Sequence, residues 1–209
     1  KVTIFYERGV LAASLRFLSP SPRTLKELGL PSVVQTFAQL ERGLVIITGP
    51  FGSGRTTTAA SLINEINRAR SEHIVTIEQP IEFLFTNDRS IIEQREVGRD
   101  TVSFEQSLEA AAREDVNVIF VSEMGSPGVV QAVLDAAESS RLVISTMDTD
   151  SVVQTIENIM TMFPEDAVQR VRVQLAATLQ GIVSQRLLPR AGGGRVAVAE
   201  VLVPPAAVR

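Results

Sequence analysis

The sequence predicts an α/β fold in which helices flank a mainly parallel sheet, and two observations support this. From residue 43 onward, short apolar runs alternate with longer amphipathic stretches, which is the pattern of repeated strand–helix units. The runs are apolar along their whole length, as expected for parallel strands that helices cover on both faces. The expected strands are residues 44–48, 74–77, 116–121, 142–146 and 196–203.

The stretches between these runs are predicted to be helical. In the last of them, apolar residues recur at helical spacing from Val168 through Leu179 to Ile182. Thr24, with Glu27 three residues later, predicts a capping box at the start of an earlier helical turn. The expected helical stretches are residues 32–41, 54–70, 104–114, 126–139, 151–161 and 165–186.

The first part of the chain is expected to lie outside the main domain. Residues 1–18 have the pattern of two strands separated at Arg8, and the two prolines within residues 19–22 forbid a helix in the linker that follows. We therefore place the main domain at residues 24–209. Because the chain begins inside a strand-like run and stops just after another, we expect both ends to be cut from a longer protein.

The composition limits the classes of function. A net charge of -4 and a pI of about 5.2 do not provide the basic surface that nucleic-acid backbones require, so we expect no nucleic-acid partner. The sequence has no cysteine, which excludes disulfides and Cys-based zinc sites and fits a reducing compartment. No apolar run approaches the roughly 18 residues of a membrane-spanning helix. These features favour a cytoplasmic protein that could dock on a membrane machine.

Residues 49–56 carry the most specific motif. Their sequence, GPFGSGRT, keeps the spacing of the phosphate-binding loop GxxxxGK(S/T) and replaces its lysine by Arg55. Gly52 and Gly54 let backbone N–H groups curl towards phosphate oxygens, and Thr56 places a hydroxyl where Mg²⁺ would sit. The alternative is an ordinary glycine-rich turn from strand to helix. The expected nucleotide contacts are Gly49, Pro50, Gly52, Ser53, Gly54, Arg55, Thr56 and Thr57.

The arginine in this loop changes its chemistry. Lysine is a compact point charge that reaches the β- and γ-phosphates, whereas the guanidinium of Arg55 is bulkier, planar and forked. Catalysis of phosphoryl transfer depends mostly on positioning. We therefore expect hydrolysis to suffer more than binding.

Five longer stretches of the chain resemble the type IV pilus retraction ATPases (PilT), within the secretion ATPase superfamily. They are residues 72–83 (EHIVTIEQPIEF), 94–98 (QREVG), 112–115 (ARED), 184–190 (SQRLLPR) and 192–197 (GGGRVA), and the similarity runs over essentially the whole chain. The resemblance implies a RecA-like P-loop ATPase domain behind a PAS-like domain, assembled as a hexameric ring that binds ATP or ADP with Mg²⁺. Residues 1–23 would then be the end of the PAS-like domain and its linker.

The resemblance also implies contacts beyond this domain. In the family, arginines of the PAS-like domain lie near the nucleotide, and Arg8 and Arg16 stand where the family has arginine. The alternative is that both are solvated strand residues. The protein would be cytoplasmic and peripheral to the inner membrane through the pilus machine. Its partners would be other copies of itself, the inner-membrane platform protein and a paralogous pilus ATPase.

Three carboxylates are candidate catalytic groups by this resemblance. Glu78 and Glu82 belong to an acidic box at the end of an expected strand, where ligands bind in open α/β sheets. Glu123 ends another apolar strand and suits the activation of water, directly or through Mg²⁺. The alternative for Glu78 and Glu82 is that either is a surface turn carboxylate. The only histidine, His73, is expected to be structural.

The same motifs depart from the family pattern at several positions. Gln79 replaces an aspartate of the acidic box, Asp148 replaces the histidine of a later box, and Gly125 replaces an arginine. Arg55, Gln79 and Asp148 are thus three changes that converge on one site. Arg55 and Asp148 could pair in a rearranged site, or the changes could simply degrade it.

Two functions of different classes remain open on the sequence. The first is a retraction-type motor ATPase whose hydrolysis is weakened. The second is a nucleotide-binding ring subunit without hydrolysis, which partners an active paralogue. The assembly and secretion branch is less favoured, because many of its members carry a tetracysteine zinc module and this chain has no cysteine.

Overall fold

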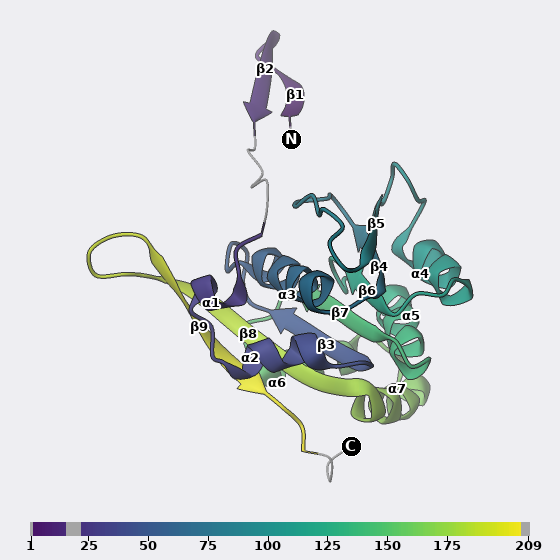
Figure 1. Cartoon of the computed structure of the whole chain (residues 1–209). Helices are drawn as coiled ribbons and strands as arrows, with labels where there is room; N and C mark the ends of the chain where they lie inside the picture. Colours follow the sequence, from purple (N-terminus) through teal and green to yellow (C-terminus); the bar gives the residue numbers. More distant parts are fainter. Residues whose placement is uncertain (1, 16–21, 206–209) are drawn as a thin grey trace.

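A seven-stranded sheet forms the centre of the molecule (Figure 1). The computed structural model describes residues 2–15 and 22–205. The strand order is β5-β4-β6-β7-β3-β8-β9, and every neighbouring pair is parallel except β8 with β9. The mainly parallel sheet predicted from the sequence is therefore confirmed. The strands are β3 (Gly43–Thr48), β4 (His73–Glu78), β5 (Ile91–Glu96), β6 (Val118–Val121), β7 (Leu142–Met147), β8 (Leu179–Pro189) and β9 (Arg195–Leu202).

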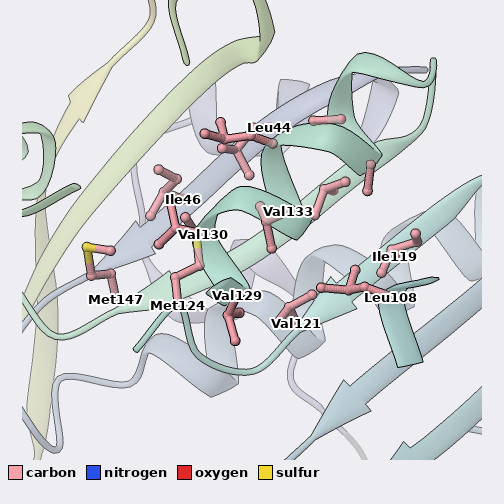
Figure 2. Packing of buried hydrophobic residues seen from close by; sticks show 14 of the residues in the cluster. Leu44, Ile46, Leu108, Ile119, Val121, Met124, Val129, Val130, Val133 and Met147 are labelled. Carbon is pink, nitrogen blue, oxygen red and sulfur yellow. The ribbon is translucent and has the colours of Figure 1, made fainter. Parts of the chain in front are cut away.

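Helices cover both faces of this sheet, because successive residues of each buried strand point to opposite sides. On one face, Val45 and Ile47 of β3 pack in a cluster with the short helices near the start of the domain and with α3. On the other face, Leu44 and Ile46 pack in a cluster with α4 to α7, part of which is drawn in Figure 2. The helices are α1 (Leu25–Leu28), α2 (Val33–Thr36), the 3₁₀ turn Phe37–Gln39, α3 (Arg55–Ala69), α4 (Phe104–Arg113), α5 (Pro127–Glu138), α6 (Val152–Thr161) and α7 (Glu165–Thr178).

The capping box predicted at the start of α1 is present. The Oγ1 atom of Thr24 accepts a hydrogen bond from the backbone N–H of Glu27, at 3.3 Å, and the carboxylate of Glu27 accepts one from the backbone N–H of Thr24, at 2.8 Å. Both exchanges satisfy donors that a helix start would otherwise leave unpaired. The helical turn therefore begins at the residue that the sequence predicted.

The helix expected over residues 165–186 is wrong after Thr178. Helix α7 ends at Thr178, and Leu179 and Ile182, which fit the helical spacing, lie in strand β8. This strand pairs in parallel with β3 as far as Ser184, and from Ile182 to Pro189 it pairs with β9 in an antiparallel hairpin. Strand β5, at the edge of the sheet, is a second element that the apolar runs did not reveal.

The first described residues form a separate two-stranded antiparallel sheet, as expected. Strand β1 (Val2–Glu7) pairs with β2 (Val10–Leu15) across a tight turn. Both turn residues, Arg8 and Gly9, have positive φ angles, of 51° and 79°. Arg16, the second arginine predicted to approach a nucleotide, lies outside the described residues. The assignment of this hairpin to a PAS-like domain stays a prediction.

Candidate functional site

The predicted site segments meet at one edge of the sheet. Within the sheet, the strands β4, β6, β7 and β3 follow one another in this order and all run parallel. Their carboxyl ends therefore lie along the same edge. Thr48 at the end of β3 stands in register with Met147 of β7, and Ile77 of β4 with Val121 of β6. Each strand is followed directly by one of the segments that the sequence singled out. In open α/β sheets this edge is where ligands bind.

The glycines of the loop after β3 are required for different reasons. A Cβ on Gly49 would lie 2.2 Å from the backbone oxygen of Gln185 and 2.6 Å from Oγ of Ser53, so no larger residue fits there. Gly52 meets nothing within 4 Å, but its φ of 78° is one that other residues rarely adopt. Gly54 combines a φ of 91° with a close neighbour, because a Cβ there would lie 3.1 Å from Nε2 of Gln185. The loop is thus closed tightly on itself.

Strand β8 supports this loop from below through Gln185. Its side-chain amide donates a hydrogen bond of 2.7 Å to the backbone oxygen of Ser53 and accepts one of 2.8 Å from the hydroxyl of Thr58. Gln185 is 1% exposed, so both bonds form away from water. No motif in the sequence predicted a role for Gln185. The signal that could have revealed it is a polar residue, Gln185, within the largely apolar stretch that forms β8.

The start of α3 is left open to a ligand. Its N-cap is Gly54, which provides no side-chain hydrogen bond, whereas serine side chains cap α4, α5 and α6. The N–H groups of the first turn therefore have no side-chain cap, and the helix dipole adds positive potential at this end. A tight glycine loop, a bare helix start and the hydroxyl of Thr56 together fit phosphate and a phosphate-bound cation. The residues present are thus compatible with a magnesium nucleotide.

A cavity of about 540 Å³ opens beside the loop. Ser53, Gly54 and Thr57 line its inner side, so it is continuous with the candidate phosphate site. The lining also includes a carboxylate, two guanidinium groups and apolar side chains, from Glu27, Arg23, Arg195, Leu28, Phe83 and Leu187. A volume of this size, with both polar and apolar walls, suits a small organic ligand.

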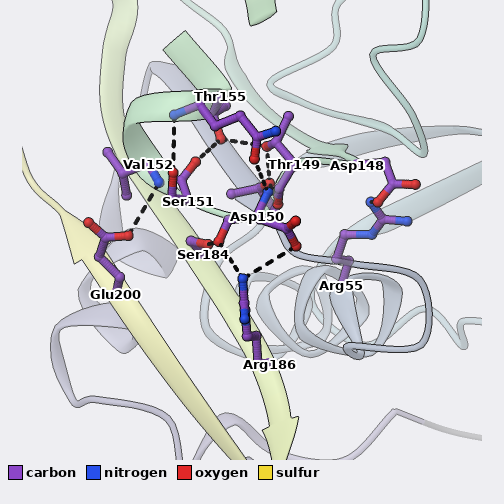
Figure 3. Close-up of polar contacts among 12 residues, drawn as sticks. Arg55, Asp148, Thr149, Asp150, Ser151, Val152, Thr155, Ser184, Arg186 and Glu200 are labelled. Atoms are coloured by element: carbon purple, nitrogen blue, oxygen red, sulfur yellow. Dashed lines mark hydrogen bonds and ion pairs between the residues drawn. The ribbon is translucent and has the colours of Figure 1, made fainter. Parts of the chain in front are cut away.

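Arg55 and Asp148 form an ion pair across this edge of the sheet (Figure 3). The distance between Nη1 of Arg55 and Oδ1 of Asp148 is 3.1 Å. The arginine side chain is 17% exposed and the aspartate side chain 58% exposed, so the pair lies at the boundary between protein and solvent. The pairing that the sequence left open is therefore present.

The segment after β7 holds Asp148 in place. The hydroxyl of the next residue, Thr149, contacts the hydroxyls of Thr48 and Thr155, and Thr48 also donates to the backbone oxygen of Thr149 at 2.6 Å. Thr149 is 3% exposed. Two residues after Asp148, Asp150 pairs with Arg186 instead, at 3.5 Å. The backbone on the carboxyl side of Asp148 is thus anchored by buried hydrogen bonds.

Glu78 lies inside the protein. It is 2% exposed, and its carboxylate accepts hydrogen bonds from Thr76 at 2.7 Å, from Gln94 at 3.1 Å and from the backbone N–H of Glu82 at 3.4 Å. Burial raises the pKa of the Glu78 carboxyl above its ordinary value, and these hydrogen bonds offset part of the rise. Glu78 thereby links β4 to β5 and to the following loop, where Glu82 is half-buried. The surface-turn alternative is wrong for Glu78.

Glu123 and Gln79 are exposed at the ends of two neighbouring strands. The backbone N–H of Gln79 donates to the hydroxyl of Ser122, at 3.1 Å, and joins the two strand ends. Met124, which is 1% exposed, donates its backbone N–H to Thr146 at 2.9 Å and fixes the chain immediately after Glu123. The Glu123 side chain is therefore presented to solvent from an anchored backbone.

His73 lies at the opposite end of the sheet, at the start of β4. Its Nδ1 atom lies 3.0 Å from the backbone oxygen of Asp115, and its Nε2 atom lies 3.2 Å from a carboxylate oxygen of Glu93. These contacts agree with the structural role expected from the sequence. Arg8 is exposed in the turn of the N-terminal hairpin.

The described residues, 2–15 and 22–205, contain neither a cluster of metal ligands nor a membrane-spanning helix. Within these ranges, no three or more His, Cys, Asp or Glu side chains are grouped so that they could hold a metal ion. Within the same ranges, no helix is long and apolar enough to cross a membrane.

Comparisons with known proteins agree with this geometry. The family model "Type II/IV secretion system protein" matches residues 11–200. The type IV pilus retraction ATPase PilT of Pseudomonas aeruginosa is 38% identical over 209 residues, which cover 100% of this chain and 61% of the relative. A twitching motility protein of Neisseria gonorrhoeae is 42% identical over 199 residues, covering 95% of this chain and 53% of the relative.

A solved structure is also similar. The crystal structure of the pilus retraction motor PilT with bound ADP has a TM-score of 0.95 and 48% identity, and the match covers 99% of this chain and 60% of that one. This chain belongs to the type II/IV secretion system protein family and has its RecA-like ATPase fold. Within that family it falls with the PilT-type pilus retraction ATPases. It spans between 53% and 61% of the length of these relatives.

Proposed function

We propose that this chain is the ATP-binding core of a type IV pilus motor subunit of the retraction or twitching type, and that it hydrolyses ATP weakly. The observation that carries the second half is the Arg55–Asp148 ion pair. In this pair, the guanidinium of Arg55, which is the cation of the phosphate loop, neutralises the carboxylate of Asp148. The family membership and the open start of α3 support the first half.

Binding would rest mainly on the backbone. The phosphates would lie in the loop of residues 49–56, at the first turn of α3, with the ribose and base in the adjoining cavity. Thr56 would hold Mg²⁺, and Glu123 would reach it through water. When bound, Mg²⁺ would neutralise phosphate charge. None of these groups is lost, so we expect adenine nucleotides to bind.

Hydrolysis would be weak because the charges around the terminal phosphate are altered. Arg55 is drawn to Asp148, and Asp148 brings a negative charge towards a site where further negative charge develops during phosphoryl transfer. Gln79 removes a carboxylate beside Glu123. Each 1.4 kcal/mol of lost transition-state stabilisation slows the reaction about tenfold.

The test is ATP turnover by the full-length protein, measured beside a nucleotide-binding titration. Arg55→Lys, Gln79→Asp and Asp148→His are made singly and together. We expect the unmodified protein to bind nucleotide and the triple variant to turn over ATP at least about tenfold faster. If the unmodified protein already matches the triple variant, this is an ordinary motor with an unusual site.

A second candidate, favoured by the same ion pair, is a ring subunit that does not hydrolyse ATP and partners an active paralogue.

In either case we propose a hexameric ring in which Arg8 and Arg16 reach a neighbouring site. A supplied arginine is worth on the order of 10³–10⁵ in rate in other phosphoryl-transfer enzymes. Light scattering of the full-length protein with nucleotide tests this assembly, and a monomer at all concentrations would exclude it. Turnover with and without the paralogue separates the two candidates. The platform protein of the inner membrane, on the cytoplasmic side, would be a further partner.

A further inference from the structure

We propose that the Arg55–Asp148 ion pair makes the site select nucleoside diphosphates over triphosphates, with Asp148 setting the ratio. This inference rests on the proposed nucleotide site. It concerns the bound nucleotide rather than the rate of hydrolysis. It therefore fails or holds separately from the proposed weakness of turnover.

The first step is the charge at the position of the terminal phosphate. In phosphate loops of this spacing, the cation after the last glycine reaches the β- and γ-phosphates. Here that cation is Arg55, and a carboxylate already lies 3.1 Å from it. The pair contributes a net charge near zero where a single lysine would contribute a positive charge. A triphosphate carries more negative charge than a diphosphate, so it loses more attraction.

The second step is that the other phosphate contacts are independent of this pair. Backbone N–H groups of the loop and of the first turn of α3 would hold the α- and β-phosphates, and Gln185 fixes the loop from the opposite side. These donors do not change when Asp148 pairs with Arg55. A diphosphate thus loses only the attraction of the cation for its β-phosphate, whereas a triphosphate loses the attraction for both its β- and γ-phosphates.

The third step is that the backbone at Asp148 is anchored and cannot move this residue away from the site. Thr149 is anchored to Thr48 and Thr155, and Met147 stands in register with Thr48 in the sheet. Only rotation of the Asp148 side chain can remove its charge from the site. Because this side chain is 58% exposed, water and salt screen its effect in part.

The guanidinium also keeps donor capacity for a phosphate. Nη1 of Arg55 is enclosed by protein and makes no hydrogen bond, and its contact with Asp148 at 3.1 Å is an ion pair. A terminal phosphate oxygen could recruit this donor only in competition with Asp148. The structure therefore places attraction and repulsion for the third phosphate side by side.

The experiment titrates the full-length protein with Mg²⁺-ADP and with a non-hydrolysable Mg²⁺-ATP analogue. We expect ADP to bind about three- to tenfold more tightly, the range expected for a partly exposed charge. In Asp148→Asn, the analogue should bind more tightly, while ADP changes little, so that the two affinities approach each other. Raising the salt concentration should shrink the difference in the unmodified protein.

Asp150→Asn is the matched control. It removes the same charge from the same loop, at the same side-chain exposure of 58%, but from a residue that pairs with Arg186. It should leave the ratio of affinities unchanged, and Asp148→Glu should preserve the ratio because it keeps the charge. Equal affinities in the unmodified protein would overturn the inference, as would equal effects of the two asparagine variants. Failure to bind either nucleotide would overturn the proposed function itself.

Discussion

The two sides of the proposed phosphate site are built in different ways. On the loop side, Gly49 and Gly54 pack against β8, and the buried amide of Gln185 holds the loop by two hydrogen bonds. On the other side, the side chains of Asp148 and Glu123 extend from anchored strand ends into solvent. The loop side is fixed by backbone and buried contacts, whereas the other side depends on exposed side chains.

This difference explains how one half of a site can keep its form while the other changes. Replacing a buried partner of the loop disturbs packing and leaves polar groups unsatisfied, which costs stability. Replacing an exposed carboxylate at a strand end alters charge and leaves the fold almost untouched. Binding and hydrolysis can therefore separate, and four substitutions test how sharp the separation is.

The largest effect is expected for Gly49→Ala. The new Cβ would lie 2.2 Å from the backbone oxygen of Gln185, so loop and strand must move apart. We expect the free energy of unfolding to fall by about 2–4 kcal/mol and nucleotide binding to be lost. Urea unfolding and a binding titration measure both quantities. Gly52→Ala is the control, because no atom lies within 4 Å of its Cβ and only the positive φ opposes it, at about 1–2 kcal/mol.

A smaller loss is expected for Gln185→Leu. This change removes the bonds to Ser53 and Thr58 and leaves two buried polar groups without partners. We expect about 1–3 kcal/mol of destabilisation, together with weaker nucleotide binding because the loop loses its support. Ser184→Ala, which deletes one 3.2 Å bond to the Asp150 backbone, is the neighbouring control. If binding is unchanged in Gln185→Leu, the loop does not depend on β8.

The pH dependence of stability should reveal the buried Glu78. Its pKa is raised by burial, so the folded state holds the proton more tightly than the unfolded state. Its contribution is fully favourable below the ordinary value of 4.5 and is lost as pH rises through the raised pKa. Glu78→Gln should therefore become more stable relative to the unmodified protein as pH rises through that window.

Glu93 provides the control of opposite sign. Its pKa is lowered, first by the hydrogen bond from Arg95, so its contribution is present above 4.5 and lost as pH falls through the lowered value. Glu93→Gln should thus be less stable than the unmodified protein at neutral pH, and the difference should vanish in acid. Parallel pH profiles for the two variants would contradict the assignment of Glu78 to the interior.

Much of this architecture could be predicted from the sequence. Strands β3 and β7 are buried on both faces, so their apolar runs have no competing interpretation. The stretch after α7 was predicted to be helical because Leu179 and Ile182 fit a helical period, although both residues lie in strand β8. The reason is tertiary: this stretch pairs with β3, which is distant in the sequence, and no local pattern encodes that pairing.

The site was predictable in part for similar reasons. The loop of residues 49–56 is a local motif, and the ion pair of Arg55 with Asp148 was foreseen as one of two possibilities. Gln185 was not assigned, because its partners Ser53 and Thr58 are more than a hundred residues away in sequence. Strand β5 was missed because it is an edge strand whose sequence, IIEQRE, is largely polar.

The smallest effect is expected for Glu123→Gln, and it tests the exposed side of the comparison directly. The side chain is exposed at the end of β6, so its replacement should change the free energy of unfolding by no more than about 0.5 kcal/mol and leave ADP affinity unchanged. The adjacent Met124→Ala is the matched control: Met124 is 1% exposed, so its truncation should cost about 2–5 kcal/mol. If Glu123→Gln destabilises the protein as much as Met124→Ala does, the strand-end carboxylate is part of the fold, and the separation between a structural loop side and a chemical acid side does not hold.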